Sequence, residues 1–396
     1  MTRVQLLDPP AYSPPYDHAL AAALARAGAA VRLVTSEFAH GPVPTPDGYQ
    51  LERRFYRRAV GAAGTPARKL SKAAWHVPEL LNWRRGLPNR ADVVHFQWLT
   101  APALDLRVVP YTVPTVLTVH DPLVRGGGRR AALGLGPEAF KRVRAVIVHS
   151  EYARGAVIEA HGLDPDDVHV IRHGALGALP TVTAVQRRDG PGAGERGLVE
   201  ATGDGADASL PAELANAGAE VPVVLCFGLI RPYKGVARLL EAWRALAPGA
   251  QLWIVGRPMV ELAPLRELAG DGVRFVPRYV SGAEERAVFA RADVVVLPYE
   301  RSERFGFSGV LATALGAGRA IVLSDVGGLA EVAQLGAAAA YPAGDTEALA
   351  TTLARVLADG AERLTLERAA TTAAREQFSW DAAARATLAL YRELGA

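Results

Sequence analysis

The sequence predicts an α/β protein made of two doubly wound, Rossmann-like domains. Its 396 residues are more than one typical domain of about 100–200 residues holds. Half of the residues are apolar and 21% are charged, a balance that excludes a disordered chain. Short apolar runs alternate with helical patterns along both halves, which is typical of parallel sheets covered by helices on both faces.

The expected strands are short apolar runs, many of them rich in valine. In the first half of the chain they are 4–7, 31–34, 93–96, 115–119, 145–149 and 168–171. In the second half they are 223–227, 252–255, 273–276, 293–297 and 320–324.

Two of the intervening helices follow directly from the spacing of apolar residues. After the strand at 223–227, apolar residues recur three and four positions apart on one helical face: Val236, Leu239, Leu240, Trp243 and Leu246. Near the end of the chain we expect Asp345 to cap a second helix, with Gly360 just past its last turn. The apolar face of that helix holds Leu349, Leu353 and Val356.

A change in composition divides the two predicted domains, 1–176 and 221–375. Residues 177–220 are rich in glycine, alanine and aspartate and lack periodicity, so we expect a linker or mobile insertion. Residues 376–396 are expected to form a helix that packs back towards the first domain. Because ligands of such sheets bind at the carboxyl ends of strands, a cleft between the domains is the expected active site.

Composition excludes several classes of protein. The one cysteine excludes a disulfide framework and a CxxC zinc site. No run of about 18 apolar residues could span a membrane, and prolines interrupt the start before a signal-peptide core, so we expect a cytosolic protein. The net charge of +3 is too small to indicate nucleic-acid binding. Asp164-Pro-Asp166 has the form of a metal-binding pair, but its surroundings favour a turn.

The charge is unevenly distributed, with a basic segment at residues 51–90. This segment holds ten Lys and Arg residues but only Glu52 and Glu79 as acids, a net charge of +8. Such a segment fits an anionic lipid surface, and hence peripheral membrane contact, or a phosphorylated acceptor. A solvated loop face is an equally good interpretation.

Two basic residues stand where a buried strand of the second half leads into the helix near 236. Arg231 and Lys234 are three positions apart in Gly228-Leu-Ile-Arg-Pro-Tyr-Lys-Gly235. Two cations at the carboxyl end of a strand suit a diphosphate and a leaving group on which negative charge grows. The alternative is a pair of surface residues in a loop.

A second stretch, 299–311, leads from the strand at 293–297 into another helix. Ser308 is a good N-cap, which places the amides of Gly309 and Val310 in the first turn, where anions bind. In the preceding loop, Glu300 or Glu303 could hydrogen-bond the hydroxyls of a sugar. An ordinary capped helix after an acidic loop is the alternative.

Together these motifs resemble glycosyltransferase family 4, whose members are retaining, nucleotide-sugar-dependent enzymes with the GT-B fold. The resemblance covers nearly the whole chain. In the second half it rests on residues 228–235, 278–280, 292–299 and 318–332. In the first half, and at the end of the chain, it rests on residues 92–98, 118–121, 149–150, 173–174 and 378–380.

The resemblance implies roles for individual residues. Catalytic candidates are His120, beside the transferred sugar, and Arg231, Lys234 and Glu303. Candidates for donor binding are Gly228, Arg231, Lys234, Arg278, Val280, Ser308, Gly309, Val310 and Glu331, of which Arg278 and Val280 face the base through backbone groups. Candidates for acceptor binding are Tyr16, Asp17, Gln97 and Trp98, together with the basic segment.

The sequence departs from the family pattern at two places that matter. The family's second glutamate, which holds the ribose, is absent: counting eight positions from Glu303 gives Leu311, and from Glu300 gives Ser308. Ser308-Gly-Val-Leu311 resembles a branch that dispenses with it. The glycine-rich loop after the first strand is replaced by the proline-rich segment 9–18, in which Asp17 can cap the next helix.

The resemblance therefore implies a retaining transferase that moves a sugar from a nucleotide diphosphate donor to an acceptor hydroxyl. The acceptor can be a polysaccharide, a glycolipid or a natural product. We expect no cofactor and no metal, with the departing diphosphate itself assisting deprotonation of the hydroxyl. Two alternatives stay open: a nucleotide-sugar epimerase of the same fold, and a non-catalytic relative that binds nucleotide sugars.

Overall fold

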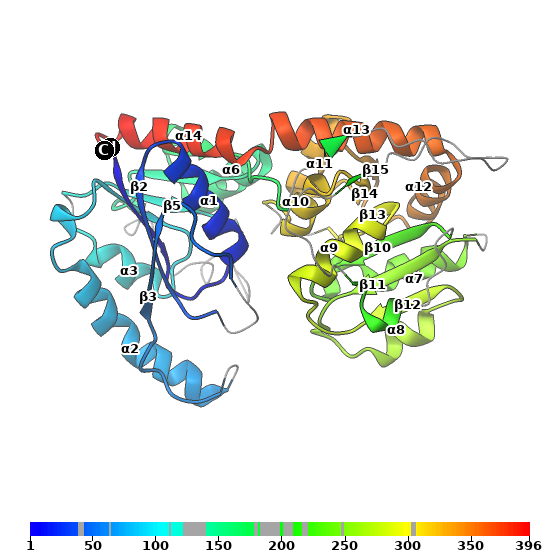
Figure 1. The fold of residues 1–396 in the computed structure, drawn as a ribbon, viewed down its shortest axis with the longest axis horizontal. Helices are drawn as coiled ribbons and strands as arrows, with labels where there is room; N and C mark the ends of the chain where they lie inside the picture. Colours follow the sequence, from blue (N-terminus) through cyan, green and yellow to red (C-terminus); the bar gives the residue numbers. More distant parts are fainter. Residues whose placement is uncertain are drawn as a thin grey trace. The chain divides into compact units, whose positions relative to one another are not determined.

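The computed structural model describes residues 1–38, 43–62, 65–110, 112–121, 140–177, 181–182, 199–200, 209–215, 221–246, 249–301 and 306–396. The chain divides into two compact units (Figure 1). The first unit is Met1–Gly174 together with Ser379–Ala396, and the second is Ala175–Phe378. Most of the expected insertion at 177–220 lies outside the described residues; within it, β8 (Thr181–Val182) pairs antiparallel with β9 (Val199–Glu200).

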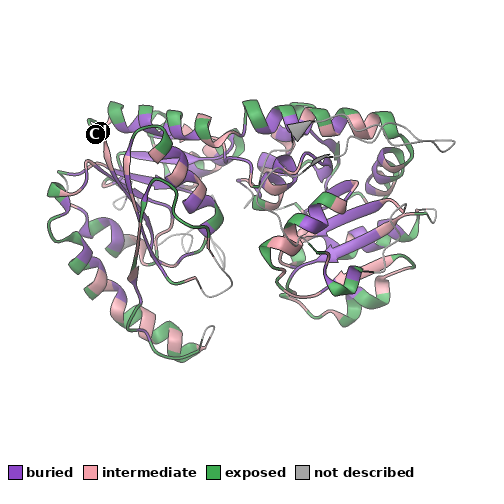
Figure 2. Cartoon of the chain, in the orientation of Figure 1, coloured by how far each residue is buried: buried purple, intermediate pink, exposed green. Residues whose placement is uncertain are grey.

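The first unit is built on a seven-stranded parallel sheet of order β3-β2-β1-β4-β5-β6-β7. Its strands are β1 (Arg3–Asp8), β2 (Ala30–Ser36), β3 (Gln50–Phe55), β4 (Val93–Phe96), β5 (Thr115–Thr118), β6 (Ala145–Val148) and β7 (Val168–Val170). Every residue of β4, β5 and β6 is buried (Figure 2). Because helices cover both faces of a parallel sheet, its central strands read as uninterrupted apolar runs.

Helices from both ends of the chain cover this sheet. They are α1 (Pro14–Arg26), α2 (Pro66–Arg84), α3 (Pro102–Val108), α6 (Glu151–His161) and α14 (Trp380–Glu393), with the 3₁₀ turns η1 (Leu87–Asn89) and η2 (Pro165–Asp167). The first helix, α1, packs against the last, α14, and Leu20 and Leu24 share a core with Leu388 and Tyr391. The tail of the chain is thus part of the first unit.

The second unit has a six-stranded parallel sheet of order β12-β11-β10-β13-β14-β15. Its strands are β10 (Val223–Phe227), β11 (Gln251–Val255), β12 (Val273–Val276), β13 (Val294–Leu297), β14 (Ala320–Ser324) and β15 (Ala339–Tyr341). The central strands β10, β13 and β14 are almost wholly buried, and Cys226 lies among their apolar residues.

Its helices are α7 (Val236–Arg244), α8 (Ala263–Leu268), α9 (Gly282–Arg291), α10 (Gly309–Gly316), α11 (Gly327–Gln334), α12 (Thr346–Ala358) and α13 (Gly360–Glu376), and its 3₁₀ turns are η3 (Ala212–Leu214) and η4 (Pro232–Lys234). The expected caps are confirmed: Ser308 accepts from the amide of Leu311 at 3.4 Å, and Asp345 from that of Ala348 at 2.9 Å. The turn at Asp164 is confirmed as well, because this residue caps η2.

Gly360 lies just past the last turn of α12, as expected, because that helix ends at Ala358. It also opens α13, which Asp359 caps by accepting from the amides of Ala361 and Glu362. Two details differ from the sequence-based expectations. Leu246 lies beyond the end of α7, although it still packs on the core. Strands β3 and β15 carry charged residues or alanines and lie at the edges of their sheets, so no apolar run marked them.

Candidate functional site

In the second unit the loop that follows β10 packs directly against the segment before α10. Gly228 has a φ of +104°, and a Cβ on it would lie 3.0 Å from Val310 Cγ2. Gly235 has a φ of +67°, and a Cβ there would overlap the carbonyl oxygen of Pro298. The two glycines therefore let residues 228–235 approach residues 298–310, at the carboxyl ends of β10 and β13.

A chain of polar contacts joins these two segments. Lys234 Nζ donates to the hydroxyl of Tyr299 and also lies 3.9 Å from the centre of its ring. The Tyr299 hydroxyl lies 2.9 Å from Ser308 Oγ, the cap of α10. Because the tyrosine hydroxyl accepts from lysine, its own proton can be donated to Ser308. Two stretches of chain thus share one site, although Lys234 and Tyr299 are 65 residues apart in the sequence.

Arg231 directly precedes η4 at the same edge of the sheet and is half-buried; its side chain makes no capping hydrogen bond. Its Nε is buried and has no hydrogen-bond partner among the described residues. Gly309 and Val310 open α10, where the first backbone amides have no partner within the helix. A cation with an unused donor and a helix N-terminus are both suited to an anion such as a diphosphate.

The side chains of the remaining donor candidates differ in their contacts within the protein. Arg278 forms bidentate ion pairs with Glu213 and Glu284, the shortest contact being 2.7 Å, and these carboxylates raise its pKa. Its side chain thus joins η3 to α9, which agrees with a role through backbone groups only. Val280 packs on the core of the unit. Glu331 lies on α11, half-buried.

Of the two glutamates considered for the family's first acidic position, Glu300 is described by the structure and Glu303 is not. Glu300 pairs with Arg238 of α7 at 2.9 Å, and a Cβ on Gly235 would lie 3.5 Å from its Oε1. Glu303 lies outside the described residues, so its catalytic role stays a prediction.

In the first unit His120 follows β5 and lies in a cluster of rings. Trp98 stacks on it with an interplanar angle of 14°, and Tyr16 meets it edge-on at 4.8 Å between centroids. Tyr16 is buried and also contacts the rings of His149, His173 and Trp380.

Hydrogen bonds fix the tautomer of His120. His149 Nδ1 lies 2.9 Å from the carbonyl oxygen of Ile171, so this nitrogen carries a proton. In its neutral form His149 Nε2 is then an acceptor, and it lies 3.3 Å from His120 Nδ1, which must donate. His120 Nε2 therefore carries a lone pair, and it is buried without a partner among the described residues. A neutral His120 can accept a hydrogen bond from a hydroxyl.

Burial keeps four histidines of this unit, His95, His120, His149 and His173, neutral. It lowers the pKa of His149 to about 4, and those of His95 and His173 to about 3. The pKa of His120 is also well below its ordinary value, first because of burial and then because of the neighbouring histidines. These rings act as hydrogen-bonding groups without charge.

Asp17 does not cap α1, contrary to the expectation from the sequence. The helix already begins at Pro14, because two prolines preset the first turn, and Asp17 lies inside that turn. Its carboxyl group is buried beside that of Asp8, the last residue of β1. Burial and the charge of Asp8 raise the pKa of Asp17 well above its usual range, and burial also raises the pKa of Asp8.

The other two acceptor candidates follow β4. Trp98 Nε1 donates to Ser13 Oγ at 2.7 Å, so its ring is fixed beside His120. Gln97 is 1% exposed, and neither its Oε1 nor its Nε2 has a partner in the described part of the protein. How these residues meet a ligand stays a prediction.

Several buried polar atoms have no hydrogen-bond partner in the described part of the protein. Those near the carboxyl ends of strands belong to Ser36, Gln97, His120, Arg231, Ser324 and Tyr341. Arg54 Nε, within β3, and His161 Nε2, at the end of α6, are also unpartnered, so such atoms are not confined to these strand ends. The side chains at the strand ends are candidates for ligand contacts, because ligands of such sheets bind there.

Replacing Gly235 by alanine is expected to destabilise the second unit by about 2–5 kcal/mol, the sum of a left-handed conformation and the close contact with Pro298. Gly336→Ala is the matched control: its φ is +71°, but nothing lies within 4 Å of the added Cβ. It should cost only about 1–2 kcal/mol. Urea unfolding of both variants measures the difference, and equal losses would contradict the close packing.

The described residues include no group of three or more histidine, cysteine, aspartate or glutamate side chains placed to hold a metal ion. Over the same part of the chain, no helix is long and apolar enough to cross a membrane.

Comparison with solved structures defines the class of fold. Sucrose-phosphate synthase from Thermosynechococcus elongatus aligns with a TM-score of 0.69 and 20% identity, covering 100% of this chain and 99% of that one. Anabaena HepE, solved in complex with UDP, aligns with a TM-score of 0.68 and 16% identity, covering 99% of this chain and 100% of the other. The fold is that of the GT-B glycosyltransferases, with two parallel-sheet α/β domains.

Sequence comparisons define the family. Residues 16–175 match the family described as "Glycosyltransferase Family 4", and residues 221–359 match "Glycosyl transferases group 1". Alpha-maltose-1-phosphate synthase of Mycolicibacterium smegmatis is 31% identical over 336 residues, which are 77% of this chain and 80% of that protein. D-inositol 3-phosphate glycosyltransferase of Xylanimonas cellulosilytica is 28% identical over 329 residues, 76% of this chain and 72% of that one. The chain belongs to the family 4-type glycosyltransferases.

Proposed function

We propose that the protein transfers a glycosyl group from a nucleoside diphosphate sugar to an acceptor hydroxyl, with retention at the anomeric carbon. The observation that carries this proposal is the contact chain Lys234–Tyr299–Ser308 beside the unpaired Nε of Arg231. It supplies two cations and the first amides of α10 at one edge of the second unit. The solved complexes of HepE hold UDP and UDP-glucose, which supports a donor of this class.

In this proposal each group has a separate task. Arg231 and Lys234 bind the diphosphate and stabilise the charge that grows on it as the glycosidic bond breaks. The backbone amides of Gly309 and Val310 donate hydrogen bonds to the same anion and keep their protons. In the first unit, His120 Nε2 accepts a hydrogen bond from a sugar hydroxyl, because its other nitrogen donates to His149. The departing diphosphate takes the proton of the incoming hydroxyl.

A thermal-shift screen against UDP, GDP, dTDP and ADP sugars tests donor binding. A donor present at about 100 times its dissociation constant should add about 2.7 kcal/mol and raise the Tm of a unit of this size by roughly 5–10 °C. NMR of the product's anomeric proton then tests retention. Conversion of a donor to its isomer without any acceptor would instead indicate an epimerase, and binding without turnover a non-catalytic relative.

Activity is expected to survive removal of divalent metal ions, because Arg231, Lys234 and the α10 amides supply the positive partners of the diphosphate. Turnover measured after dialysis against EDTA should equal that of the untreated enzyme. Loss of turnover that Mg²⁺ or Mn²⁺ restores would contradict a metal-independent mechanism.

A further inference from the structure

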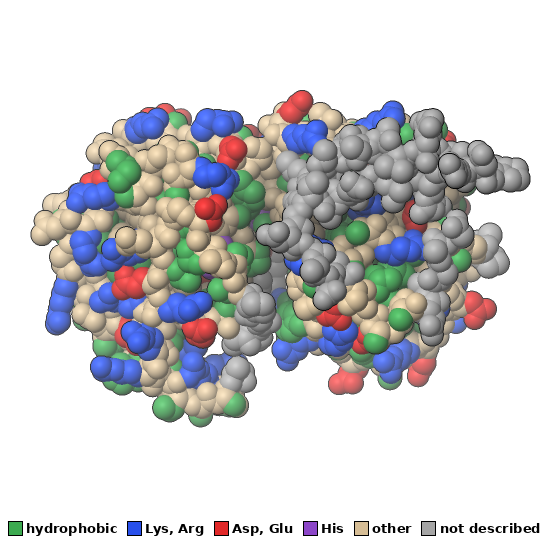
Figure 3. All heavy atoms as spheres, in the orientation of Figure 1, with side chains coloured by type: hydrophobic (Ala, Val, Ile, Leu, Met, Phe, Trp, Pro, Cys, Tyr) green, Lys and Arg blue, Asp and Glu red, His purple; other side chains and the backbone are tan. Residues whose placement is uncertain are grey.

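A basic pocket opens at the carboxyl ends of β2 and β3 in the first unit. It has a volume of about 340 Å³ and is lined by Ser36, Glu37, Arg53, Phe55, Tyr56, Arg57, Arg68 and Lys72. Ser36 is the last residue of β2 and pairs with Phe55, the last residue of β3, while Asp8 ends the neighbouring β1. The pocket thus lies on the same edge of the sheet as the acceptor candidates. Figure 3 shows Lys and Arg side chains gathered over the part of this unit where α2 and β3 lie.

The lining of this pocket is strongly positive. Four cationic side chains, Arg53, Arg57, Arg68 and Lys72, face one carboxylate, that of Glu37, which leaves a net charge of +3. Glu37 pairs with Arg53 at 3.3 Å, but its own side chain is 75% exposed. Among the described residues, no carboxylate pairs with the other three cations, of which Arg68 donates to the carbonyl oxygen of Ala59.

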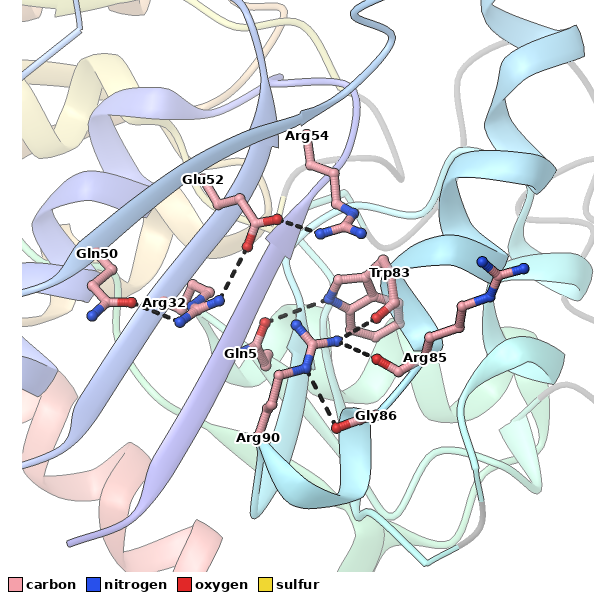
Figure 4. Close-up of polar contacts among 9 residues, drawn as sticks. All are labelled: Gln5, Arg32, Gln50, Glu52, Arg54, Trp83, Arg85, Gly86 and Arg90. Carbon is pink, nitrogen blue, oxygen red and sulfur yellow. Dashed lines mark hydrogen bonds and ion pairs between the residues drawn. The ribbon is translucent and has the colours of Figure 1, made fainter.

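Other arginines of the basic segment have structural partners, as Figure 4 shows. Glu52 lies between Arg32 and Arg54 and pairs with both, at 3.4 and 2.5 Å. Arg90 donates to the carbonyl oxygens of Trp83 and Arg85 at the end of α2. Arg57, Arg68 and Lys72 form no ion pair among the described residues and are therefore available to an anionic ligand.

Tyr56, which lines the pocket, is fixed by hydrogen bonds to buried groups. The Tyr56 hydroxyl lies 2.9 Å from His76 Nδ1, and His76 Nε2 lies 2.5 Å from Asp105, which is fully buried. Lys72 Nζ lies 4.8 Å from the centre of the Tyr56 ring, so the ring orients the ammonium group. Burial, followed by the charge of Arg68, lowers the pKa of Lys72, an effect that a bound anion would oppose.

Ser36, which belongs to the lining, carries a buried hydroxyl. The residue is 4% exposed, and its Oγ has no partner in the described part of the protein. A hydroxyl can donate to a phosphate oxygen, and a buried hydroxyl left unpaired costs free energy. A preformed ring of cations with one spare donor is complementary to a compact, doubly charged anion.

We propose that the pocket of Ser36, Arg57, Arg68 and Lys72 binds a phosphomonoester group of the acceptor, so that this glycosyltransferase acts on a phosphorylated hydroxyl compound. The inference rests on the proposed function for the transfer step, but anion binding does not require it. A second cavity of about 740 Å³, which shares Arg53 and Arg57 and is lined by Trp75, adjoins the first and offers room for the rest of the acceptor. Phosphorylated sugars appear in the names of the maltose-1-phosphate, sucrose-phosphate and inositol 3-phosphate relatives.

The test measures binding of glucose 1-phosphate, glucose 6-phosphate, inositol 3-phosphate and orthophosphate to the full chain by calorimetry. Arg57→Gln and Lys72→Gln should each weaken binding of the best phosphate compound by about tenfold or more, the loss expected for one charged hydrogen bond. Arg85→Gln removes the same charge from the end of α2 but lines neither cavity, and in Figure 4 its guanidinium points away from the other labelled residues. It should bind like the wild type.

Two further arms separate the possible outcomes. Binding to vesicles of phosphatidic acid is compared with binding to vesicles of phosphatidylcholine, which shows whether the phosphomonoester belongs to a lipid or to a soluble compound. For either source, the proposal is supported if Arg57→Gln and Lys72→Gln lose binding and Arg85→Gln keeps it. Equal weakening by Arg85→Gln, or phosphate binding unchanged in both pocket variants, would overturn it. Donor binding is measured in the same samples, so a failure of the proposed function is seen independently of the pocket.

Discussion

Replacing Arg231 or Lys234 by alanine is expected to lower kcat by about a hundredfold or more. Both cations lie where β10 leads into α7, and each would lose one charged partner of the departing diphosphate, which costs about 10²–10³ in rate. The two effects should differ in character. Lys234 also contacts Tyr299, so its loss should disturb the start of α10 and raise KM for the donor as well.

Arg266→Ala is the control for these variants. It removes a positive charge from the exposed side of α8 in the same unit, and its kcat should equal that of the wild type. Circular dichroism and Tm show whether each variant is folded, since a folded but slow enzyme is required. Unchanged kcat in both Arg231→Ala and Lys234→Ala would remove these residues from the mechanism.

The first unit is expected to lose stability steeply between pH 6.5 and about 4. Four buried histidines have pKa values far below their unfolded value of about 6.5, so the unfolded chain takes up protons in this range that the native unit does not. Stability is therefore present above pH 6.5 and lost as the pH falls. The raised pKa of Asp17 acts in the opposite sense, because the native state binds a proton at this carboxyl group more tightly than the unfolded chain does.

Each proton that only the unfolded chain binds contributes about 1.4 kcal/mol for each pH unit, so several buried histidines together give a steep slope. Urea unfolding at pH 7, 6 and 5, followed by circular dichroism, measures this slope. NMR of the histidine rings provides an independent check. Titration near pH 6.5 of the signals assigned to His95, His120, His149 and His173 in the folded protein would contradict the expected burial.

The sequence was sufficient for those parts of the fold in which apolar patterning is strong. The valine-rich central strands and the α7 and α12 patterns are confirmed, because buried parallel strands leave continuous apolar runs. Strand β3, with the sequence Gln-Leu-Glu-Arg-Arg-Phe, could not be found in this way. It lies at the edge of its sheet and most of its side chains are exposed or half-buried, so it tolerates charged residues.

The candidate site was predictable where a motif and a local cap coincide, as at Ser308. What sequence reasoning missed are contacts between segments far apart in the chain. Nothing local indicates that Tyr299 would join Lys234 to the cap of α10, or that His149 would fix the tautomer of His120. The basic segment that contains Lys72 was considered for a phosphorylated acceptor, but the pocket itself could not be predicted, because it depends on β3 being the neighbour of β2.

The return of α14 to the first unit makes the two ends of the polypeptide unequal as sites for engineering. The second unit is one uninterrupted stretch, Ala175–Phe378, and can be excised as a single fragment. The first unit is encoded in two pieces, so a fragment ending at Gly174 would lack Tyr391, whose hydroxyl lies 2.6 Å from His95 Nδ1. Deleting Ser379–Ala396 would therefore destabilise the first unit. In a fragment that contains only the first unit, joining Ser379–Ala396 to Gly174 through a short linker should restore that stability.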